Sequence, residues 1–152
     1  AALVHGPLTL QSEFIDARVN RPTGGGTDLN FWGYYAQASY FLTGEHRPYD
    51  RQQGIFTRVR PYERFFFVDG QRHGRRRLLW GSGAWEIATR ISQLDLNSQN
   101  VQGGRISDVT FGVNWFWNPR ARWEFNYIHA YLDRNALRGN ADMFAARFQF
   151  TF

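Results

Sequence analysis

The sequence predicts an all-β protein, specifically an antiparallel transmembrane β-barrel of the outer-membrane type. Apolar and polar residues alternate over several segments, and a period of two is typical of strands with one apolar and one polar face. The chain has 14 Phe, 7 Tyr and 6 Trp residues, and several lie near the ends of these segments, as the interfacial girdles of a membrane barrel require: Trp32, Tyr40, Trp85, Trp115, Trp117, Trp123 and Tyr131. The mean hydropathy is −0.52, and no apolar run approaches the roughly 18 residues of a spanning helix, which excludes a helical membrane protein.

Six strands are clear, at residues 8–19, 29–42, 82–95, 106–117, 121–132 and 142–152. In the first, Leu8, Leu10 and Phe14 share one parity. Ile15 and Val19 have the other parity, which indicates a β-bulge in this strand.

The other five strands alternate regularly. One parity is aromatic or aliphatic, and it includes Trp32, Tyr34, Tyr40, Trp85, Ile87, Ile91, Val109, Phe111, Val113, Trp115, Trp117, Trp123, Phe125, Phe144, Phe148, Phe150 and Phe152. The other parity carries charges in mid-strand, namely Glu86, Arg90, Glu124 and Arg147. A soluble β-sandwich also alternates, but aromatic residues at the strand ends favour a barrel with a lipid-facing surface and a polar lumen.

The connections point the same way. The tight turn Asn118-Pro119-Arg120 joins two strong strands, whereas residues 20–28, 97–104 and 133–140 are expected to form longer polar loops. Short turns on one side and long loops on the other are typical of outer-membrane barrels.

Six strands cannot close a barrel, since the smallest single-chain barrels have about eight. A hairpin of residues 55–60 and 63–68 around Pro61 would bring the number to eight, but both runs are short and rich in Arg. Residues 1–6 resemble the middle of a longer sequence and carry no secretory signal. We therefore expect residues 1–152 to be the C-terminal part of a single, larger barrel domain.

Composition excludes several kinds of site. The chain has no Cys, so disulfide scaffolds, thiolate metal sites and cysteine nucleophiles are ruled out. All 18 basic residues are Arg, and 13 acidic residues leave a formal net charge of +5. Arginine keeps its charge and binds phosphate or carboxylate through two parallel hydrogen bonds, which favours an anionic partner.

Several blocks resemble the phosphate-selective porin O and P family. The segment GYYAQASYFLTGE, from Gly33 to Glu45, is similar to a family signature, and residues 47–51 continue the match. Further blocks follow in family order: GAWEIATR from Gly83, DVTFGVNW from Asp108, Asn118-Pro119, and the last strand with Phe152.

This resemblance implies an outer-membrane porin of about sixteen strands, usually a homotrimer, located in the bacterial outer membrane among its lipids. It further implies passage of phosphate, polyphosphate or related anions through an Arg-lined wall and a Lys constriction. The chain has no Lys, so that constriction lies outside it or differs in this member. Anion preference is therefore better supported than selectivity for phosphate.

Residues 43–81 form an Arg-rich insertion between two strands. They hold nine Arg and four acidic residues, a surplus equal to the net charge of the whole chain. One interpretation is a basic loop in solvent, and the other is an element that attracts anions. Connections of this length are uncommon without a function.

We expect the insertion to fold inward or against the barrel mouth, with Phe65 and Phe67 packed on the wall. This arrangement would present Arg58, Arg60 and Arg64 to passing anions. Residues 75–77, three consecutive Arg, are expected in solvent or near anionic head groups.

Arg90, Arg122 and Arg147 are expected to point into the lumen, because each lies on the polar parity of its strand. Glu86 and Glu124 share that parity and would orient them. The alternative is that these charges form purely structural ion pairs within the lumen.

Other functions fit less well. Nucleic-acid binding would interleave aromatic residues with the basic cluster, whereas here they lie on the other parity. Passive diffusion involves no catalysis, cofactor or metal. An enzyme would need a nucleophile and base, but His5, His46, His73 and His129 lack a matching Ser or Asp pattern, and His129 is expected at the membrane interface. A non-channel barrel with a structural or adhesive role is the main alternative.

Overall fold

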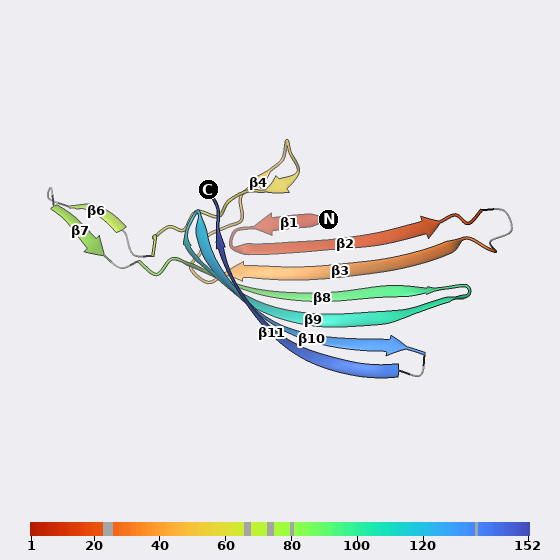
Figure 1. Cartoon of the computed structure of the whole chain (residues 1–152). Coiled ribbons are helices and arrows are strands. Elements are labelled where there is room, and N and C mark those ends of the chain that lie inside the picture. The colour runs from red at the N-terminus through yellow and green to blue at the C-terminus, as the bar shows by residue number, and fades with distance from the viewer. Residues whose placement is uncertain (23–25, 66–67, 73–74, 80, 136) are drawn as a thin grey trace.

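The computed structural model describes residues 1–22, 26–65, 68–72, 75–79, 81–135 and 137–152. Within these ranges the chain forms one seven-stranded antiparallel sheet and two small two-stranded sheets (Figure 1). No helix in the described part of the chain is long and apolar enough to cross a membrane.

The strands follow one another in the order of the chain. They are β1 (Ala2–His5), β2 (Leu8–Val19), β3 (Leu29–Phe41), β4 (Tyr49–Asp50), β5 (Ile55–Phe56), β6 (Val68–Arg72), β7 (Arg75–Leu79), β8 (Ala84–Ser98), β9 (Val101–Asn118), β10 (Ala121–Arg134) and β11 (Leu137–Phe150). The large sheet has the order β1-β2-β3-β8-β9-β10-β11, while β4 pairs with β5 and β6 with β7. The described sheet is therefore open, with β1 and β11 at its edges.

All six predicted strands form and pair as neighbours, and β1 is an additional strand that the sequence pattern did not reveal. The prediction of long loops at 97–104 and 133–140 was wrong. β8 ends at Ser98 and β9 begins at Val101, while β10 ends at Arg134 and β11 begins at Leu137. Gln99 and Asn135 have φ of 49° and 53°, the left-handed conformation that two-residue hairpin turns use, so the polar residues there continue the strands.

Two further details differ from the prediction. β2 contains no bulge, because its pairing with β3 is continuous from Leu8 opposite Tyr40 to Val19 opposite Leu29. Ile15 and Val19 are simply exposed on the other face, at 54% and 47%. The register shifts occur elsewhere, between Asp95 and Asn97 of β8 and between Ala121 and Arg122 of β10.

The described residues also do not form the predicted hairpin around Pro61. Residues 55–56 pair with Tyr49–Asp50, and residues 68–72 pair with Arg75–Leu79, so the strands on either side of Pro61 belong to different hairpins. The reason is that Val59, in the middle of the first predicted strand, is only 5% exposed and packs on the large sheet instead.

The large sheet has one apolar and one polar face, as the alternation predicts. On the apolar face, cross-strand partners match across five strands, for example in the row Tyr40, Ile87, Val113, Phe125 and Ala146. At the end near the Asn118-Pro119-Arg120 turn, a second row consists of aromatic rings. Its ring centroids lie 4.9 Å apart for Trp85 and Trp115 and 5.0 Å apart for Trp123 and Phe148.

The connection between β3 and β8, residues 42–83, is here named the crossing segment. It leaves and rejoins the sheet at the end where β9 turns into β10. Figure 1 shows β6 and β7 beyond this end of the sheet and β4 above β1. The long connection therefore lies at the same end of the sheet as the two-residue β9–β10 turn.

Candidate functional site

A buried carboxylate on the polar face anchors the first part of the crossing segment. Glu86 of β8 has a fully buried side chain and accepts two hydrogen bonds from Arg47, with Nε–Oε1 at 2.8 Å and Nη2–Oε2 at 2.7 Å. Asn114 of β9 donates a third bond to it at 2.8 Å. Bidentate pairing and full occupancy of the oxygens offset the cost of burying this charge.

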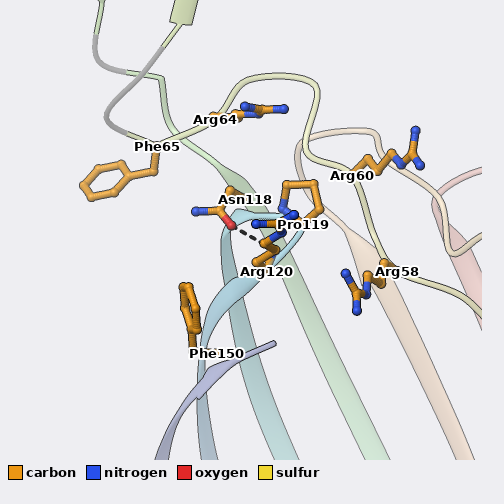
Figure 2. Close-up of a pocket in the computed structure, with 8 residues that line it drawn as sticks. All are labelled: Arg58, Arg60, Arg64, Phe65, Asn118, Pro119, Arg120 and Phe150. Atoms are coloured by element: carbon orange, nitrogen blue, oxygen red, sulfur yellow. Dashed lines mark hydrogen bonds between the residues drawn. The ribbon is translucent and has the colours of Figure 1, made fainter. Parts of the chain in front are cut away.

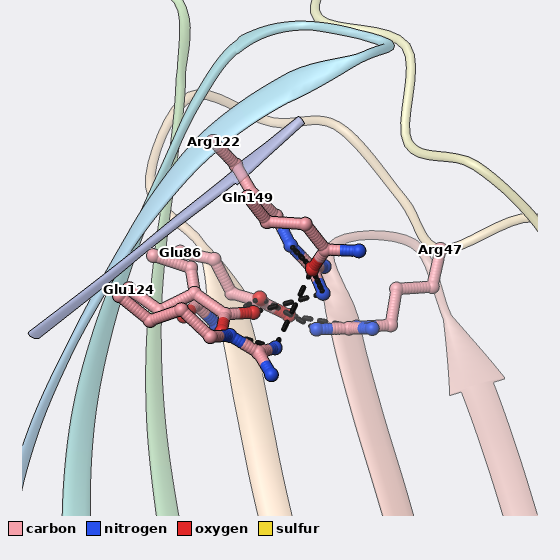
Figure 3. Close-up of polar contacts among 7 residues, drawn as sticks. Arg47, Glu86, Arg122, Glu124 and Gln149 are labelled. Atoms are coloured by element: carbon pink, nitrogen blue, oxygen red, sulfur yellow. Dashed lines mark hydrogen bonds and ion pairs between the residues drawn. The ribbon is translucent and has the colours of Figure 1, made fainter. Parts of the chain in front are cut away.

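A second carboxylate on the same face joins two of the predicted arginines. Glu124 of β10 lies 2.8 Å from Nη2 of Arg122 through Oε1 and 2.6 Å from Nε of Arg147 through Oε2. Gln149 of β11 accepts hydrogen bonds from Nε and Nη2 of Arg122 at 3.1 and 2.7 Å. Figure 3 shows these side chains converging with Arg47 and Glu86 into one cluster.

Neighbouring strands explain why this cluster forms. Glu86 lies opposite Asn114, Asn114 opposite Glu124, and Glu124 opposite Arg147, so alternation places all four on one row of the polar face. Three Arg and two Glu leave the cluster with one net positive charge.

Arg90 is the predicted lumen arginine that the cluster does not include. It is exposed on the polar face, and its guanidinium carbon lies 4.3 Å from the centre of the Tyr35 ring on the adjacent strand. The prediction that carboxylates hold the arginines applies to Glu124, which contacts Arg122 and Arg147. Glu86 instead holds Arg47, which the sequence pattern had not selected.

The crossing segment is packed on the polar face by a small apolar cluster. Val59 contacts Phe41 of β3, Ala84 of β8 and Phe116 of β9, and all four are nearly inaccessible. Glu45, only 2% exposed, joins the two ends of residues 45–62, because it accepts a hydrogen bond from the backbone N of Tyr62 at 3.0 Å. Arg58, next to Val59, is thereby brought to the end of β9 and β10.

A hollow of about 470 Å³ lies between the crossing segment and these strand ends. Four arginines line it, Arg47, Arg58, Arg120 and Arg122, and no acidic residue is among the residues that line it. The guanidinium groups of Arg122 and Arg47 are oriented by Glu124 and Glu86. Within the described part of the chain Arg120 has no ion pair, and Arg58 donates a hydrogen bond from Nη2 to the backbone oxygen of Phe152 at 3.4 Å. Clustered arginine forks without lining carboxylates are suited to bind phosphate-like anions.

Arg60 and Arg64 lie farther out. With Arg58 and Arg120 they line a hollow of about 740 Å³ around the β9–β10 turn. Figure 2 shows Arg58 and Arg60 on one side of the turn and Phe65 on the other. The structure thus gathers the three predicted arginines around one turn, and only Arg58 also reaches the four-arginine hollow.

Phe65 packs on the sheet, as predicted, but on its apolar face. Its ring centroid lies 4.6 Å from that of Trp115 and 5.4 Å from that of Trp117, and its backbone N donates to the carbonyl of Trp117 at 2.8 Å. The crossing segment therefore passes from the polar face at Val59 around the sheet end to the apolar face at Phe65. The predictions for Phe67 and for the side chains of residues 75–77 lie outside the described residues.

His129 lies on the apolar face, where its Nδ1 is 2.7 Å from Oδ1 of Asp142, which also accepts a hydrogen bond from the Tyr127 hydroxyl at 2.7 Å. Across the described ranges, no group of three or more potential metal ligands is gathered. Arg47, Asn114, Arg120 and Gln149 are cluster or hollow residues that the sequence reasoning missed. For Arg47, its position directly after the GYYAQASYFLTGE block was an available signal.

Comparisons with known proteins agree with this picture. A profile of the family described as phosphate-selective porin O and P matches residues 1–152. Porin O of Pseudomonas aeruginosa is 26% identical over 159 residues, which cover 97% of this chain and 33% of that protein. An uncharacterized protein of Caulobacter vibrioides is 33% identical over 102 residues, which cover 67% of this chain and 18% of that protein.

The chain thus spans about a third or less of the length of these two relatives. Its antiparallel sheet, with one apolar and one polar face, fits a portion of such a protein. With its match over all 152 residues, the chain belongs to the phosphate-selective porin O and P family of the bacterial outer membrane.

Proposed function

We propose that this chain forms part of the wall of an outer-membrane porin of about sixteen strands, through which small phosphate-like anions diffuse passively. The observation that carries the proposal is the hollow lined by Arg47, Arg58, Arg120 and Arg122 without an acidic lining residue. A pore attracts anions when rings of Arg or Lys line it, and each binding site must be weak enough to release the ion.

The apolar face is the surface that would meet lipid. Aromatic rings lie near both ends of its apolar band, with Trp85 and Trp115 stacked at one end and Phe14, Trp32 and Tyr34 stacked at the other. Such paired aromatic girdles are typical of transmembrane barrels.

The positions of the charged residues that border this apolar band indicate that the strands are tilted, as they are in a barrel wall. On β11 the first charged residue of the apolar face is Asp142, and on β2 it is Asp16. Following the cross-strand partners, the row of Asp142 meets β2 at Ser12, four residues before Asp16. Four residues are about 13 Å along a strand, and five strand spacings are about 24 Å, so the strands tilt by about 30° against the band. Barrels tilt their strands by about 35–45°.

The polar face would then line the aqueous lumen. We infer that Arg90, Arg122 and Arg147 lie along the path and that Arg58, Arg60 and Arg64 lie at its end near the β9–β10 turn. Association into a homotrimer stays a prediction, which cross-linking of the full-length protein in outer membranes would test.

The experiment is a planar-bilayer measurement on the full-length protein. Replacing Arg58, Arg60 and Arg64 together by Gln removes three positive charges from the proposed path. We expect the anion-over-cation permeability ratio, taken from the reversal potential in a salt gradient, to fall about two- to fivefold, because fewer fixed charges attract anions.

The matched control is Gln at Arg18, Arg134 and Arg138, three exposed arginines at the opposite end of the sheet. This variant should leave the permeability ratio nearly unchanged. An unchanged reversal potential in the first variant would remove those three arginines from the path. Absence of any conductance in the unmodified protein would favour the non-channel barrel with a structural or adhesive role.

A further inference from the structure

The two carboxylates of the polar-face cluster differ in their surroundings. Glu86 is fully buried, and its oxygens are occupied by Arg47 and Asn114. Glu124 is 13% exposed, and its partners are a half-buried Arg122 and an Arg147 whose side chain is 63% exposed. Glu86 therefore belongs to the packed interior of the cluster, whereas Glu124 lies at its accessible surface.

The position of Glu124 places it between two hollows of the polar face. Its side chain lines a hollow of about 560 Å³ together with Arg47, Arg90 and Asp108. Its partner Arg122 lines the four-arginine hollow, and Arg47 lines both. An ion that moves along the polar face between the hollows passes the carboxylate of Glu124.

We propose that Glu124 sets the affinity of this path for oxyanions, as a built-in counter-anion that orients Arg122 and Arg147 and offsets part of their charge. This inference rests on the proposed porin function. With Glu124 the cluster carries one net positive charge, and without it two. Bidentate arginine sites bind phosphate strongly, while conduction requires rapid release, so a neighbouring carboxylate keeps the site weak.

A purely structural ion pair makes a different prediction. In the pair of Glu124 with Arg147, the arginine side chain is 63% exposed, whereas the carboxylate is only 13% exposed. Loss of a structural pair would alter the resistance of the protein to unfolding and leave ion binding in the pore as before. Loss of a counter-anion alters ion binding, whatever its effect on the resistance to unfolding.

The test is Glu124→Gln in the full-length protein, with single-channel conductance measured against phosphate concentration and, separately, against chloride. We expect the half-saturating phosphate concentration to fall about three- to tenfold, because one negative charge is removed within a few ångströms of the site. The maximal conductance should also fall, because bound phosphate leaves more slowly. Chloride, with a single charge, should show a smaller change.

Glu13→Gln is the matched control. Glu13 lies on the polar face of β2 opposite Tyr35, is exposed, and has no ion pair within the described residues. The substitution Glu13→Gln removes one negative charge from the same face and leaves the cluster unchanged. Glu124→Asp, which keeps the charge, should restore most of the original half-saturation.

Arg147→Gln provides an independent variant, since its side chain is largely exposed and tolerates replacement. It lowers the net charge of the cluster to zero and should raise the half-saturating concentration. Folding of every variant is checked by the heat-dependent shift of the native band on gels.

The outcomes separate this inference from the proposed function. No saturable anion current in the unmodified protein overturns the proposed function and this inference together. A saturable current with equal half-saturation in Glu124→Gln and the unmodified protein overturns this inference alone. Equal shifts in Glu124→Gln and Glu13→Gln also overturn it, since the general charge of the face, rather than the position of Glu124, would then set the affinity.

Discussion

The two faces of the seven-stranded sheet are built from the same strands, yet they use their side chains in opposite ways. On the apolar face, Phe65 of the crossing segment covers Trp115 and Trp117, but many other side chains stay exposed, such as Phe111 at 56% and Phe144 at 83%. On the polar face, three arginines and two glutamates form one cluster of ion pairs, in which Glu86 is completely buried.

This difference shows that the apolar face, unlike the polar face, needs a nonaqueous environment. An apolar surface of this extent is unfavourable in water, and lipid would remove it from water. The polar face has its own compensation, because nearly every carboxylate oxygen in its cluster meets an arginine or amide. Three substitutions test the comparison, in order of decreasing effect.

The largest effect is expected from Phe111→Arg, which places a charge near the middle of the apolar band. An arginine facing lipid at the bilayer midplane costs about 2–4 kcal/mol. We expect the variant to fail in assembly when refolded into lipid vesicles, measured as the folded fraction on unheated gels.

Thr110→Arg is the control, because residue 110 is next in the chain but faces the polar side, opposite Arg90 and Ile128. It should assemble nearly as well as the unmodified protein. Equal loss in both variants would contradict the assignment of the two faces.

The second prediction concerns the buried pair on the polar face. Arg47→Met leaves Glu86 buried with only Asn114 as a partner, at a cost of about 3 kcal/mol. The double variant Arg47→Met with Glu86→Gln should recover much of this loss, because the unpaired charge is gone. Urea unfolding in vesicles, followed by tryptophan fluorescence, measures both. If the double variant were as unstable as the single one, burial of charge would not be the cause.

The smallest effect is expected from Val59→Ala, which tests how the crossing segment attaches to the polar face. Val59 is 5% exposed against Phe41, Ala84 and Phe116, and loss of its methyl groups costs about 1–2 kcal/mol. The loss falls on the segment rather than on the sheet, so faster proteolysis of residues 42–64 is the expected readout. Ile55→Ala is the control, since Ile55 is 49% exposed. Unchanged proteolysis would show that other contacts hold the segment.

Much of the fold was predictable because alternation is a local property. In a run such as 142–152, a strand places the alternating Phe residues on one face, and the same holds for the apolar residues of 106–117 and 121–132. The extent of the strands was not predictable. Gly103 and Gly104, Asn97 and Asn135 have the composition of a loop. The β8–β9 pairing nevertheless resumes after a register shift beside the glycines, with Asn97 opposite Gln102 and Ser98 opposite Val101.

For the candidate site, parity correctly selected Arg122, Glu124 and Arg147 as neighbours, because cross-strand pairs follow once each strand's faces are known. Parity gave no information on Arg47 or Arg58, which lie in an irregular segment. Their position depends on the packing of Val59 against Phe41, Ala84 and Phe116 and on the hydrogen bond between Glu45 and Tyr62, which is 17 residues away in sequence.

By itself, the sequence determined the class of fold, the two faces of each strand and the concentration of net charge in one connection, since all three depend on local pattern and composition. Only the tertiary structure decided that this connection wraps around the sheet end, from Val59 on the polar face to Phe65 on the apolar face. It also decided that Arg47 and Arg58 meet Arg120 and Arg122 in one hollow. The physical reason is that buried contacts over long sequence separations select one path among many for an irregular chain, and no periodicity encodes them.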